Sequence, residues 1–420
     1  MGSKIKLVIE GGNKLRGNIR IDSAKNAVLP ILAGTVLVND VVRLKNVPKL
    51  IDIHNMLQIL ASLGVKIRWD KRDLIIDSRD MTSSDATALE SRTIRGSIFL
   101  LGSILGRFRT ARLTYPGGCA IGNRPIDLHI QGLRDLGVTV REKAGFITCS
   151  SRRARGGDVY LDFPSVGATE NLMMASVLGR NSVRIINAAK EPEVVDLANF
   201  LNHCGARIHG AGTSTITIEG VKSLSGCEYT PIPDRIITGS YMLAVASAGG
   251  SVTLENTVPG HNQSLITKLV KSGCKINYTE DKIFIESDGR NKSIASIQTS
   301  PYPGFPTDLQ SQISAYQTIC RGVSTVTENL FESRFKFVPE LVKMGARVTV
   351  RDRTAIINGV DHLDGSLVEA QDLRGGVALV IAALSARGTT VIENAEYIYR
   401  GHANIEDDLA RVGANIIKLT

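Results

Sequence analysis

The sequence predicts an α/β protein made of six copies of one unit, with the helices buried and the sheets outside them. Two repeated patterns and one bias in composition lead to this fold class. Six helix patterns end alike, as in LASLGVKI and LRDLGVTV, and a β-branched strand pattern precedes each of these helices. Successive endings are about 70 residues apart, which gives the length of the unit. The endings carry Gly64, Gly137, Gly205, Gly273, Gly345 and Gly413, and the strands cover residues 42–46, 111–115, 183–187, 252–256, 325–329 and 390–394.

Each unit holds two helices of different character. The first is apolar on nearly every side and rich in Gly, Ala and Ser, as in GSIFLLGSILG, SYMLAVASAGG and GVALVIAALSA. Such a helix is expected to be buried and closely packed. The second, for example residues 125–136, has an apolar and a charged face and is expected at the surface. Because the first helices are buried, the sheets must lie outside them.

Length and composition set the class of protein. A chain of 420 residues is too long for one hydrophobic core, so two domains are expected. Its 43% of hydrophobic residues and mean hydropathy of +0.04 indicate a well-packed soluble protein. The apolar runs are shorter than the ~18 residues of a membrane span, and the N-terminus MGSKIKLVIEGG lacks the apolar stretch of a secretory signal. The expected location is therefore the cytoplasm, with no membrane partner.

Cysteine spacing and charge narrow the range of partners. Six cysteines, at positions 119, 149, 204, 227, 274 and 320, form no CxxC pair, which favours free thiols in a reducing compartment over disulfides or a zinc site. The net charge is +9, but the basic residues form no long run and aromatic residues make up only 5% of the chain. This pattern argues against nucleic acid and favours small anionic molecules as partners.

Polar residues gather at the starts of the six buried helices. The segments are SAKN (23–26), SRTIRGS (91–97), SVGATEN (165–171), PDRIITGS (233–240), PTDLQSQ (306–312) and DLRGG (372–376). Helix N-termini offer unpaired N–H groups and a partial positive charge, which suit an anion. Lys25, Arg95, Arg235 and Arg374 add cations. Six such starts converging on one cleft predict a site for a ligand with several negative charges. The alternative is that these residues only cap their helices.

One unit is interrupted by a loop of unusual composition, PGGCAIGNRPIDLH at residues 116–129. Three glycines and a proline surround Cys119, and Arg124 follows closely. Glycines permit unusual backbone angles, and a nearby cation favours the thiolate form of a cysteine. Cys119 is therefore predicted to be a reactive thiol that acts as acid, base or nucleophile, the alternative being an inert loop cysteine. The chain has no GxxxxGK[ST] motif and no strand-linked GxGxxG motif for a nucleotide phosphate.

Ten segments, spread over nearly the whole chain, together resemble the UDP-N-acetylglucosamine 1-carboxyvinyltransferase family of enolpyruvyl transferases. They are SAKNAVLPIL (23–32), NVPKLIDI (46–53), PGGCAIGNRPIDLH (116–129), SVGATEN (165–171), EPEVVDLANFL (191–201), PDRIITG (233–239), FPTDLQSQ (305–312), FESRF (331–335), DLRGG (372–376) and IYRGHANIEDDL (398–409). The resemblance implies two inside-out α/β barrel domains, each of three βαβαββ-type units. It assigns residues 24–232 to one domain and residues 1–23 plus 233–420 to the other, because the first strand belongs to the second domain. The connections near Asp22 and Thr230 would then be hinges.

The same resemblance implies an activity and its site. The enolpyruvyl group of phosphoenolpyruvate, a co-substrate, passes to the 3-hydroxyl of UDP-N-acetylglucosamine by addition and elimination, releasing phosphate in the first committed step of peptidoglycan synthesis. Asp308 matches the base. Cys119 matches the proton donor, which can also form a covalent adduct with phosphoenolpyruvate and is alkylated by fosfomycin. Lys25, Arg124 and Arg400 match the cations that hold phosphoenolpyruvate. Positions matching contacts to the nucleotide sugar are Asn26, Arg95, Arg124, Pro125, Ile126, Asp127, Leu128, Ser165, Val166, Gly167, Asp308 and Leu330, and further cleft positions are Glu191, Asp234, Asp372 and Arg374.

The resemblance implies no metal and no cofactor, and it leaves the oligomeric state open, with a monomer compatible. Two positions depart from it: Phe163 stands where many relatives have lysine, and Tyr397 where they often have histidine. A missing cation at position 163 would weaken diphosphate binding unless Arg152, Arg153 or Arg155 compensates. Two other functions are weighed against the main one. A 5-enolpyruvylshikimate 3-phosphate synthase is disfavoured because its GNAGTAMRPL-type loop is absent, and a silent UDP-sugar-binding paralogue because Cys119 and Asp308 are intact.

Overall fold

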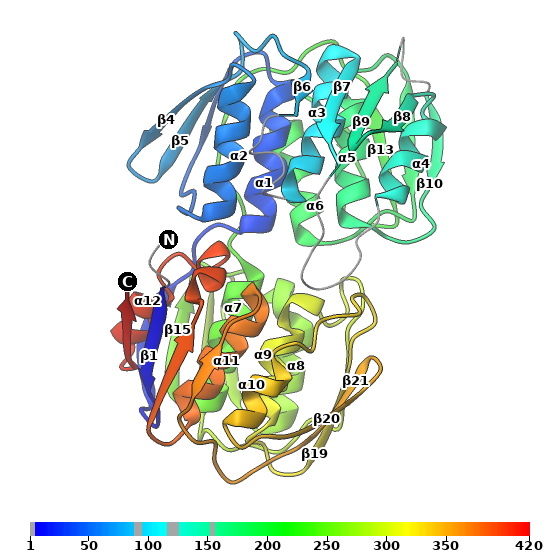
Figure 1. Ribbon diagram of the computed structural model, residues 1–420. Helices are drawn as coiled ribbons and strands as arrows, with labels where there is room; N and C mark the ends of the chain where they lie inside the picture. The colour runs from blue at the N-terminus through cyan, green and yellow to red at the C-terminus, as the bar shows by residue number, and fades with distance from the viewer. Residues whose placement is uncertain (1–4, 88–94, 116–125, 152–155) are drawn as a thin grey trace. The chain divides into compact units, whose positions relative to one another are not determined.

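The computed structural model describes residues 5–87, 95–115, 126–151 and 156–420 (Figure 1). Within these ranges the chain forms two compact units. Unit 1 comprises the residues up to Asp22 together with those from Pro233 to Thr420, and unit 2 comprises the described residues from Ser23 to Ile232. Three four-stranded sheets are found in the described part of each unit.

Unit 2 follows the order βαβαββ three times. The first repeat comprises α1 (Lys25–Gly34), β3 (Val41–Leu44), α2 (Ile51–Ser62), β4 (Lys66–Asp70) and β5 (Asp73–Asp77), and it takes its first strand, β14 (Glu228–Tyr229), from the other end of the unit. The second comprises β6 (Asp85–Ala86), α3 (Phe99–Phe108), β7 (Thr110–Thr114), α4 (Asp127–Asp135), β8 (Thr139–Lys143) and β9 (Phe146–Ser150). The third comprises β10 (Gly157–Tyr160), α5 (Val166–Val177), β11 (Ser182–Ile186), α6 (Pro192–His203), β12 (Arg207–His209) and β13 (Thr215–Glu219).

Unit 1 repeats the same order. Its first repeat comprises β2 (Leu15–Arg20), α7 (Arg235–Ala248), β15 (Gly250–Glu255), α8 (Gln263–Ser272), β16 (Lys275–Tyr278) and β17 (Lys282–Ser287). The next comprises β18 (Ser296–Gln298), α9 (Gln310–Gln317), β19 (Val323–Thr327), α10 (Val338–Lys343), β20 (Arg347–Arg351) and β21 (Thr354–Asn358). The last comprises β22 (Leu367–Glu369), α11 (Leu373–Ser385), β23 (Thr389–Glu393), α12 (Ile405–Arg411), β24 (Asn415–Leu419) and the N-terminal strand β1 (Lys6–Glu10).

Every sheet has the same internal pairing. The first two strands of each repeat are parallel, and the remaining pairs are antiparallel, as in β6–β7–β9–β8 and β22–β23–β1–β24. The central strands alternate buried and exposed residues, as expected for a sheet with one face on a core. Two N-terminal strands complete sheets of unit 1: β1 in its last repeat and β2 in its first.

The first helix of each repeat is buried, which confirms the predicted placement of helices inside sheets. Figure 1 shows α1, α3 and α5 among the sheets of unit 2, and α7, α9 and α11 among those of unit 1. In α11 the whole stretch from Arg374 to Leu384 is buried. Small residues let these helices approach closely: a Cβ atom on Gly102 of α3 would lie 2.2 Å from the carbonyl oxygen of Asn171 in α5.

The six repeated glycines lie just after the second helices, where they were predicted. All six have φ between 76° and 116°, the left-handed region that glycine adopts without a steric cost. The N–H of the next residue donates to a leucine carbonyl in the preceding turn, which satisfies a helix C-terminus in every repeat. The acceptors are Leu60, Leu133, Leu201, Leu269, Leu341 and Leu409. The repeated sequence ending is therefore a helix stop.

Two chain segments connect the units. In unit 2 the N–H of Ala24 donates to the carbonyl of Ile232 at 2.7 Å, and in unit 1 that of Asp234 donates to the carbonyl of Asp22 at 2.9 Å. Each unit thus has one backbone hydrogen bond that joins its ends of the two connecting segments. No helix in the described part of the chain is long and apolar enough to cross a membrane.

Candidate active site

In unit 2, a buried ion pair joins the starts of two helices. Lys25 is the first residue of α1, and its Nζ lies 3.1 Å from Oδ2 of Asp52 in the first turn of α2. The side chains are only 11% and 9% exposed. Asp52 therefore positions the Lys25 ammonium, and Asn26 follows it in α1, partly exposed.

The start of α5 is built by close contacts with α4. The hydroxyl of Ser165 accepts a hydrogen bond from the N–H of Ala168, so this serine caps the helix. Next to it, a Cβ on Gly167 would lie 3.0 Å from the ring of His129. Asn171 joins the helices: its amide nitrogen lies 2.9 Å from Nδ1 of His129, and its Oδ1 accepts the N–H of Gly102 at 2.7 Å. These contacts fix the orientation of the 165–167 backbone.

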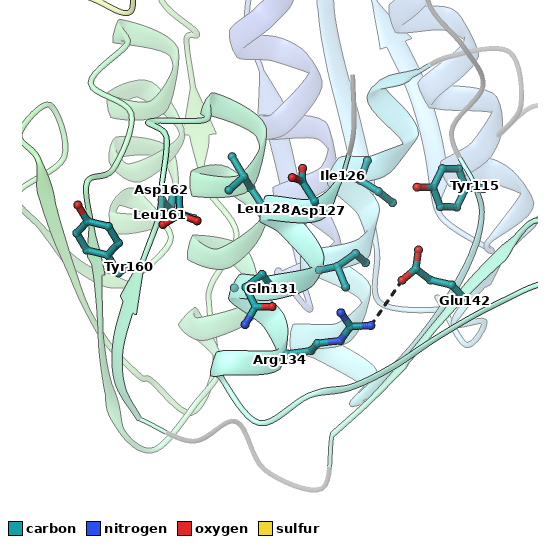
Figure 2. Close-up of a pocket in the computed structure, with 12 residues that line it drawn as sticks. Tyr115, Ile126, Asp127, Leu128, Gln131, Arg134, Glu142, Tyr160, Leu161 and Asp162 are labelled. Atoms are coloured by element: carbon teal, nitrogen blue, oxygen red, sulfur yellow. Dashed lines mark ion pairs between the residues drawn. The ribbon is translucent and has the colours of Figure 1, made fainter. Parts of the chain in front are cut away.

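Three of the predicted residues, Ile126, Asp127 and Leu128, line a cavity of about 390 Å³ in unit 2. Figure 2 shows Asp127 and Leu128 at the start of α4 and Ile126 just before it, with Tyr115 on one side and Tyr160 on the other. The remaining lining residues are Ile130, Gln131, Gly132, Arg134, Glu142, Leu161 and Asp162. The cavity thus combines two tyrosine rings with the exposed carboxylates of Asp127, Glu142 and Asp162 and the guanidinium group of Arg134.

A carboxyl group without polar partners lies deeper in unit 2. Glu170 of α5 is fully buried, and neither of its carboxyl oxygens has a hydrogen-bond partner in the described part of the chain. Burial, together with the nearby charges of Glu193 and Glu191, raises the pKa of Glu170 well above its usual value. Glu191, one of the predicted cleft residues, is the N-cap of α6, and its charge acts on Glu170.

In unit 1, Asp308 lies between two arginines. It belongs to the short 3-10 helix Thr307–Leu309 that precedes α9. Its Oδ1 accepts a hydrogen bond from Arg334 and its Oδ2 one from Arg374, both at 2.5 Å. The arginine side chains are 2% and 8% exposed, whereas that of Asp308 is 22% exposed. The carboxylate is therefore the accessible member of a buried, charge-assisted network.

A buried glutamate fixes the backbone beside Asp308. Glu328, which directly follows β19, accepts hydrogen bonds from the Thr307 hydroxyl at 2.8 Å and from the N–H groups of Leu330 and Phe331 at 2.8 and 3.1 Å. Its side chain is completely buried. The predicted contact residue Leu330 is thereby held to the segment that carries Asp308.

Three of the polar helix starts are capped by their own side chains. Asp234 accepts the N–H groups of Ile236 and Ile237 at the start of α7, and Asp372 accepts those of Arg374 and Gly375 at the start of α11. With Ser165 on α5, these caps already satisfy N–H groups that the sequence analysis had assigned to an anion. No such side-chain cap is made at α1 or α9.

Comparison with known proteins identifies the family. The EPSP synthase family, 3-phosphoshikimate 1-carboxyvinyltransferase, matches residues 9–409. The UDP-N-acetylglucosamine 1-carboxyvinyltransferase 2 of Caldanaerobacter subterraneus is 49% identical over 414 residues, covering 99% of both chains. The UDP-N-acetylglucosamine 1-carboxyvinyltransferase of Clostridium botulinum is 46% identical over 99% of this chain and 100% of its own. The chain belongs to this family of enolpyruvyl transferases.

Solved structures support the same fold class. The enolpyruvyl transferase NikO from Streptomyces tendae superposes with a TM-score of 0.88 at 23% identity, covering 99% of both chains. An EPSP synthase from Acinetobacter baumannii gives a TM-score of 0.76 at 16% identity over the full length of both. The predicted fold of two inside-out α/β domains is confirmed.

The residues that match this family's site are divided between the two units. Unit 1 holds Asp234, Asp308, Leu330, Asp372, Arg374 and Arg400, and unit 2 holds Lys25, Asn26, Arg95, Ile126, Asp127, Leu128, Ser165, Val166, Gly167 and Glu191. The structure brings together Asp308 with Arg374, and residues 126–128 in one cavity. Cys119, Arg124 and Pro125 lie outside the described residues. Arg400 ends the 3-10 helix Ala395–Arg400 and is partly exposed.

Sequence reasoning missed three residues that hold predicted ones in place: Asp52, Glu328 and Arg334. Asp52 and Arg334 lie in segments that carried the family resemblance, but nothing in the sequence distinguished them from surface charges. Both departures from the family are at the surface, with Phe163 47% and Tyr397 37% exposed. Phe163 follows Asp162 of the cavity wall in the chain but is not one of the lining residues.

Proposed function

We propose that the protein transfers the enolpyruvyl group of phosphoenolpyruvate to the 3-hydroxyl of UDP-N-acetylglucosamine and releases phosphate. The observation that carries this proposal is the match to relatives with that name over nearly the whole of both chains, at 49% and 46% identity. The reaction would be the first committed step of peptidoglycan synthesis.

The reaction needs two proton transfers and a site for several negative charges. In the addition step the sugar oxygen bonds to C2 of phosphoenolpyruvate, its proton goes to a base, and an acid protonates the C3 methylene. In the elimination step C3 loses a proton and the C2–O bond to phosphate breaks, which restores the double bond. We assign the base to Asp308 and the acid to Cys119. Each positioned proton transfer typically contributes ~10²–10⁴ in rate.

The environment of Asp308 supports the role of base. Arg334 and Arg374 each donate a hydrogen bond to one oxygen of the carboxylate. The side chain of Asp308 is 22% exposed, so a substrate hydroxyl can reach it. The buried arginines keep the carboxylate oriented, so that little rearrangement is needed when the hydroxyl approaches.

The cations supply the binding of the anionic substrates in this proposal. Lys25, Arg124 and Arg400 would hold the phosphate and carboxylate of phosphoenolpyruvate. In unit 2 the cavity lined by residues 126–128 would receive the uridine end of the nucleotide sugar, with Tyr115 and Tyr160 beside the base. The proposal includes no metal or cofactor and places the enzyme in the cytoplasm, and it leaves the oligomeric state open, with a monomer compatible.

An acceptor assay tests the proposal. Phosphate release from phosphoenolpyruvate should depend on UDP-N-acetylglucosamine and should stop in the presence of fosfomycin. If shikimate 3-phosphate supports the release instead, the protein would be a 5-enolpyruvylshikimate 3-phosphate synthase. If neither acceptor supports phosphate release but UDP-N-acetylglucosamine still binds, the protein would be the silent paralogue.

Cys119→Asp tests the role of the loop cysteine separately. A carboxylic acid can donate the proton but cannot be alkylated as a thiol is, so the variant should keep turnover and lose its sensitivity to fosfomycin. Fosfomycin sensitivity that persists in the variant would remove Cys119 from this role.

A further inference from the structure

Two cysteines outside the candidate active site are in contact. Cys204 follows the last residue of α6, and Cys227 immediately precedes β14. Their sulfur atoms lie 3.1 Å apart and share a hydrogen bond. A disulfide bond is about 2.05 Å long, so a shift of roughly 1 Å would bring the two sulfurs to bonding distance.

Backbone hydrogen bonds on both sides hold the pair in place. The N–H of Ser225 donates to the carbonyl of Cys204 at 2.8 Å, and the N–H of Arg43 in β3 donates to the carbonyl of Cys227 at 2.9 Å. Between them, the N–H of Gly226 donates to the carboxylate of Asp40 at 2.9 Å. The contact between the thiols therefore follows from the way β14 closes the first sheet of unit 2.

The two thiols have different environments. Cys204 is 1% exposed, and its hydrogen bond with Cys227, together with burial, raises its pKa. Cys227 is partly exposed, and the hydrogen bond from Cys204 lowers its pKa. Burial raises the pKa of Cys149 and of Cys320 to about 12. Among the described cysteines, Cys227 is thus the one that combines access with stabilisation of the thiolate.

We propose that Cys204 and Cys227 are a dithiol site that low-molecular-weight disulfides, such as glutathione disulfide, oxidise reversibly to an intramolecular disulfide. The Cys227 thiolate attacks one sulfur of the small disulfide, forms a mixed disulfide and releases one thiolate. Cys204 then loses its proton, attacks the sulfur of Cys227 and releases the second thiolate. Two electrons pass from the protein to the small disulfide, which becomes two thiols.

The new bond would fasten the last strand of unit 2 to α6. That strand is already tied to the helix, because the Tyr229 hydroxyl donates to the Asp196 carboxylate at 2.6 Å and the N–H of Ile232 donates to the same group at 3.1 Å. The ring of Tyr229 also contacts that of Phe200, 5.5 Å away. Oxidation would add a covalent link to this junction, from which the chain leaves unit 2. The site is distinct from the predicted reactive thiol of Cys119.

Peptide mapping of the full-length native protein tests the site. The protein is incubated with glutathione disulfide, its remaining thiols are alkylated, and it is digested with trypsin without reduction. Cys204 and Cys227 fall in the separate tryptic peptides 191–207 and 223–235, each with a single cysteine. We expect these two peptides to be joined, and dithiothreitol to separate them. The oxidised protein should also unfold roughly 5–10 °C higher in unit 2, because the bond closes a loop in the unfolded chain.

Single variants test the order of the steps. Cys204→Ser should leave a stable mixed disulfide on Cys227, whereas Cys227→Ser should leave Cys204 unreacted. Cys320→Ser is the matched control and should still give the linked peptides. The proposal is overturned if the native wild-type protein never gives linked peptides when its accessible thiols are consumed, or gives them only after denaturation in urea. Reaction of Cys204 in the Cys227→Ser protein at the wild-type rate would overturn the assignment of the attacking thiol.

Discussion

Replacing Asp308 with asparagine removes the negative charge between two buried guanidinium groups while keeping the shape of the side chain. Arg334 and Arg374 contact the carboxylate at 2.5 Å each, and their side chains are 2% and 8% exposed. Because an amide cannot take up the hydroxyl proton, we expect kcat to fall by ~10²–10⁴. The KM for UDP-N-acetylglucosamine should change less, because Asp308 is one of several positions that match contacts to the nucleotide sugar and the others are unchanged.

The same substitution should destabilise unit 1. Breaking a buried ion pair by removing one partner typically costs about 3–5 kcal/mol. Asp308 retains 22% exposure, so we expect the lower end of this range, about 3 kcal/mol. Adding Arg334→Met removes one of the unpaired cations. The double variant should therefore be more stable than the sum of the two single losses, by about 1–3 kcal/mol.

Two measurements check this reasoning. Phosphate release gives kcat and KM, and urea unfolding gives the free energy of unfolding for the four proteins of the cycle. Asp361→Asn is the control, because Asp361 also pairs with an arginine, Arg290, but its side chain is 80% exposed. The control should match the wild type in both assays. A fall in kcat of less than tenfold for Asp308→Asn would refute its role as the base. A stability equal to that of the control would refute the buried network.

Three further predictions concern packing and buried carboxyl groups. Gly102→Ala places a Cβ 2.2 Å from the carbonyl oxygen of Asn171 and should cost about 1–3 kcal/mol in urea unfolding; an unchanged midpoint would mean that α3 and α5 can separate freely. Burial raises the pKa of Asp196 from 3.8 to about 6, so the folded protein holds this proton more tightly than the unfolded chain does. The resulting stabilisation is present below about pH 4 and is lost as the pH rises to about 6. Between these pH values the free energy of unfolding of Asp196→Asn should therefore rise by roughly 3 kcal/mol relative to that of the wild type. Parallel pH profiles of the two unfolding free energies would contradict this. Glu170→Gln should be at least as stable as the wild type at pH 8, because it removes the cost of ionising a buried group beside Glu193; a clear loss of stability there would show that the carboxylate form is needed.

Much of the fold could be predicted from the sequence, because it depends on the local chemistry of the residues. The six glycines mark helix ends because glycine adopts the left-handed conformation after a helix without the steric cost that a Cβ brings, and all six have the expected φ. Helices that are apolar on all sides can be stable only inside a core, so their burial also followed from composition. Strand pairing was harder to predict from the sequence, since β1 and β14 each complete a sheet whose other strands are far away in the chain.

For the candidate site, too, the sequence indicated some of the residues but not the contacts between them. Motif chemistry and family resemblance in the sequence selected Lys25 and Asp308, whose side chains can bind an anion or accept a proton. The partners of these residues, Asp52 and Arg334, come from other helices and loops. The sequence alone does not distinguish a buried charged residue from one at the surface.

By itself, the sequence determined the repeat, the helix stops, the buried helices and the family, because each depends on local residue order or on similarity along the chain. Only the tertiary structure decided which charges lose water and pair, that Ser165, Asp234 and Asp372 cap their own helices, and that Cys204 meets Cys227. Burial and contact between residues distant in the chain arise only when the sheets close around their helices.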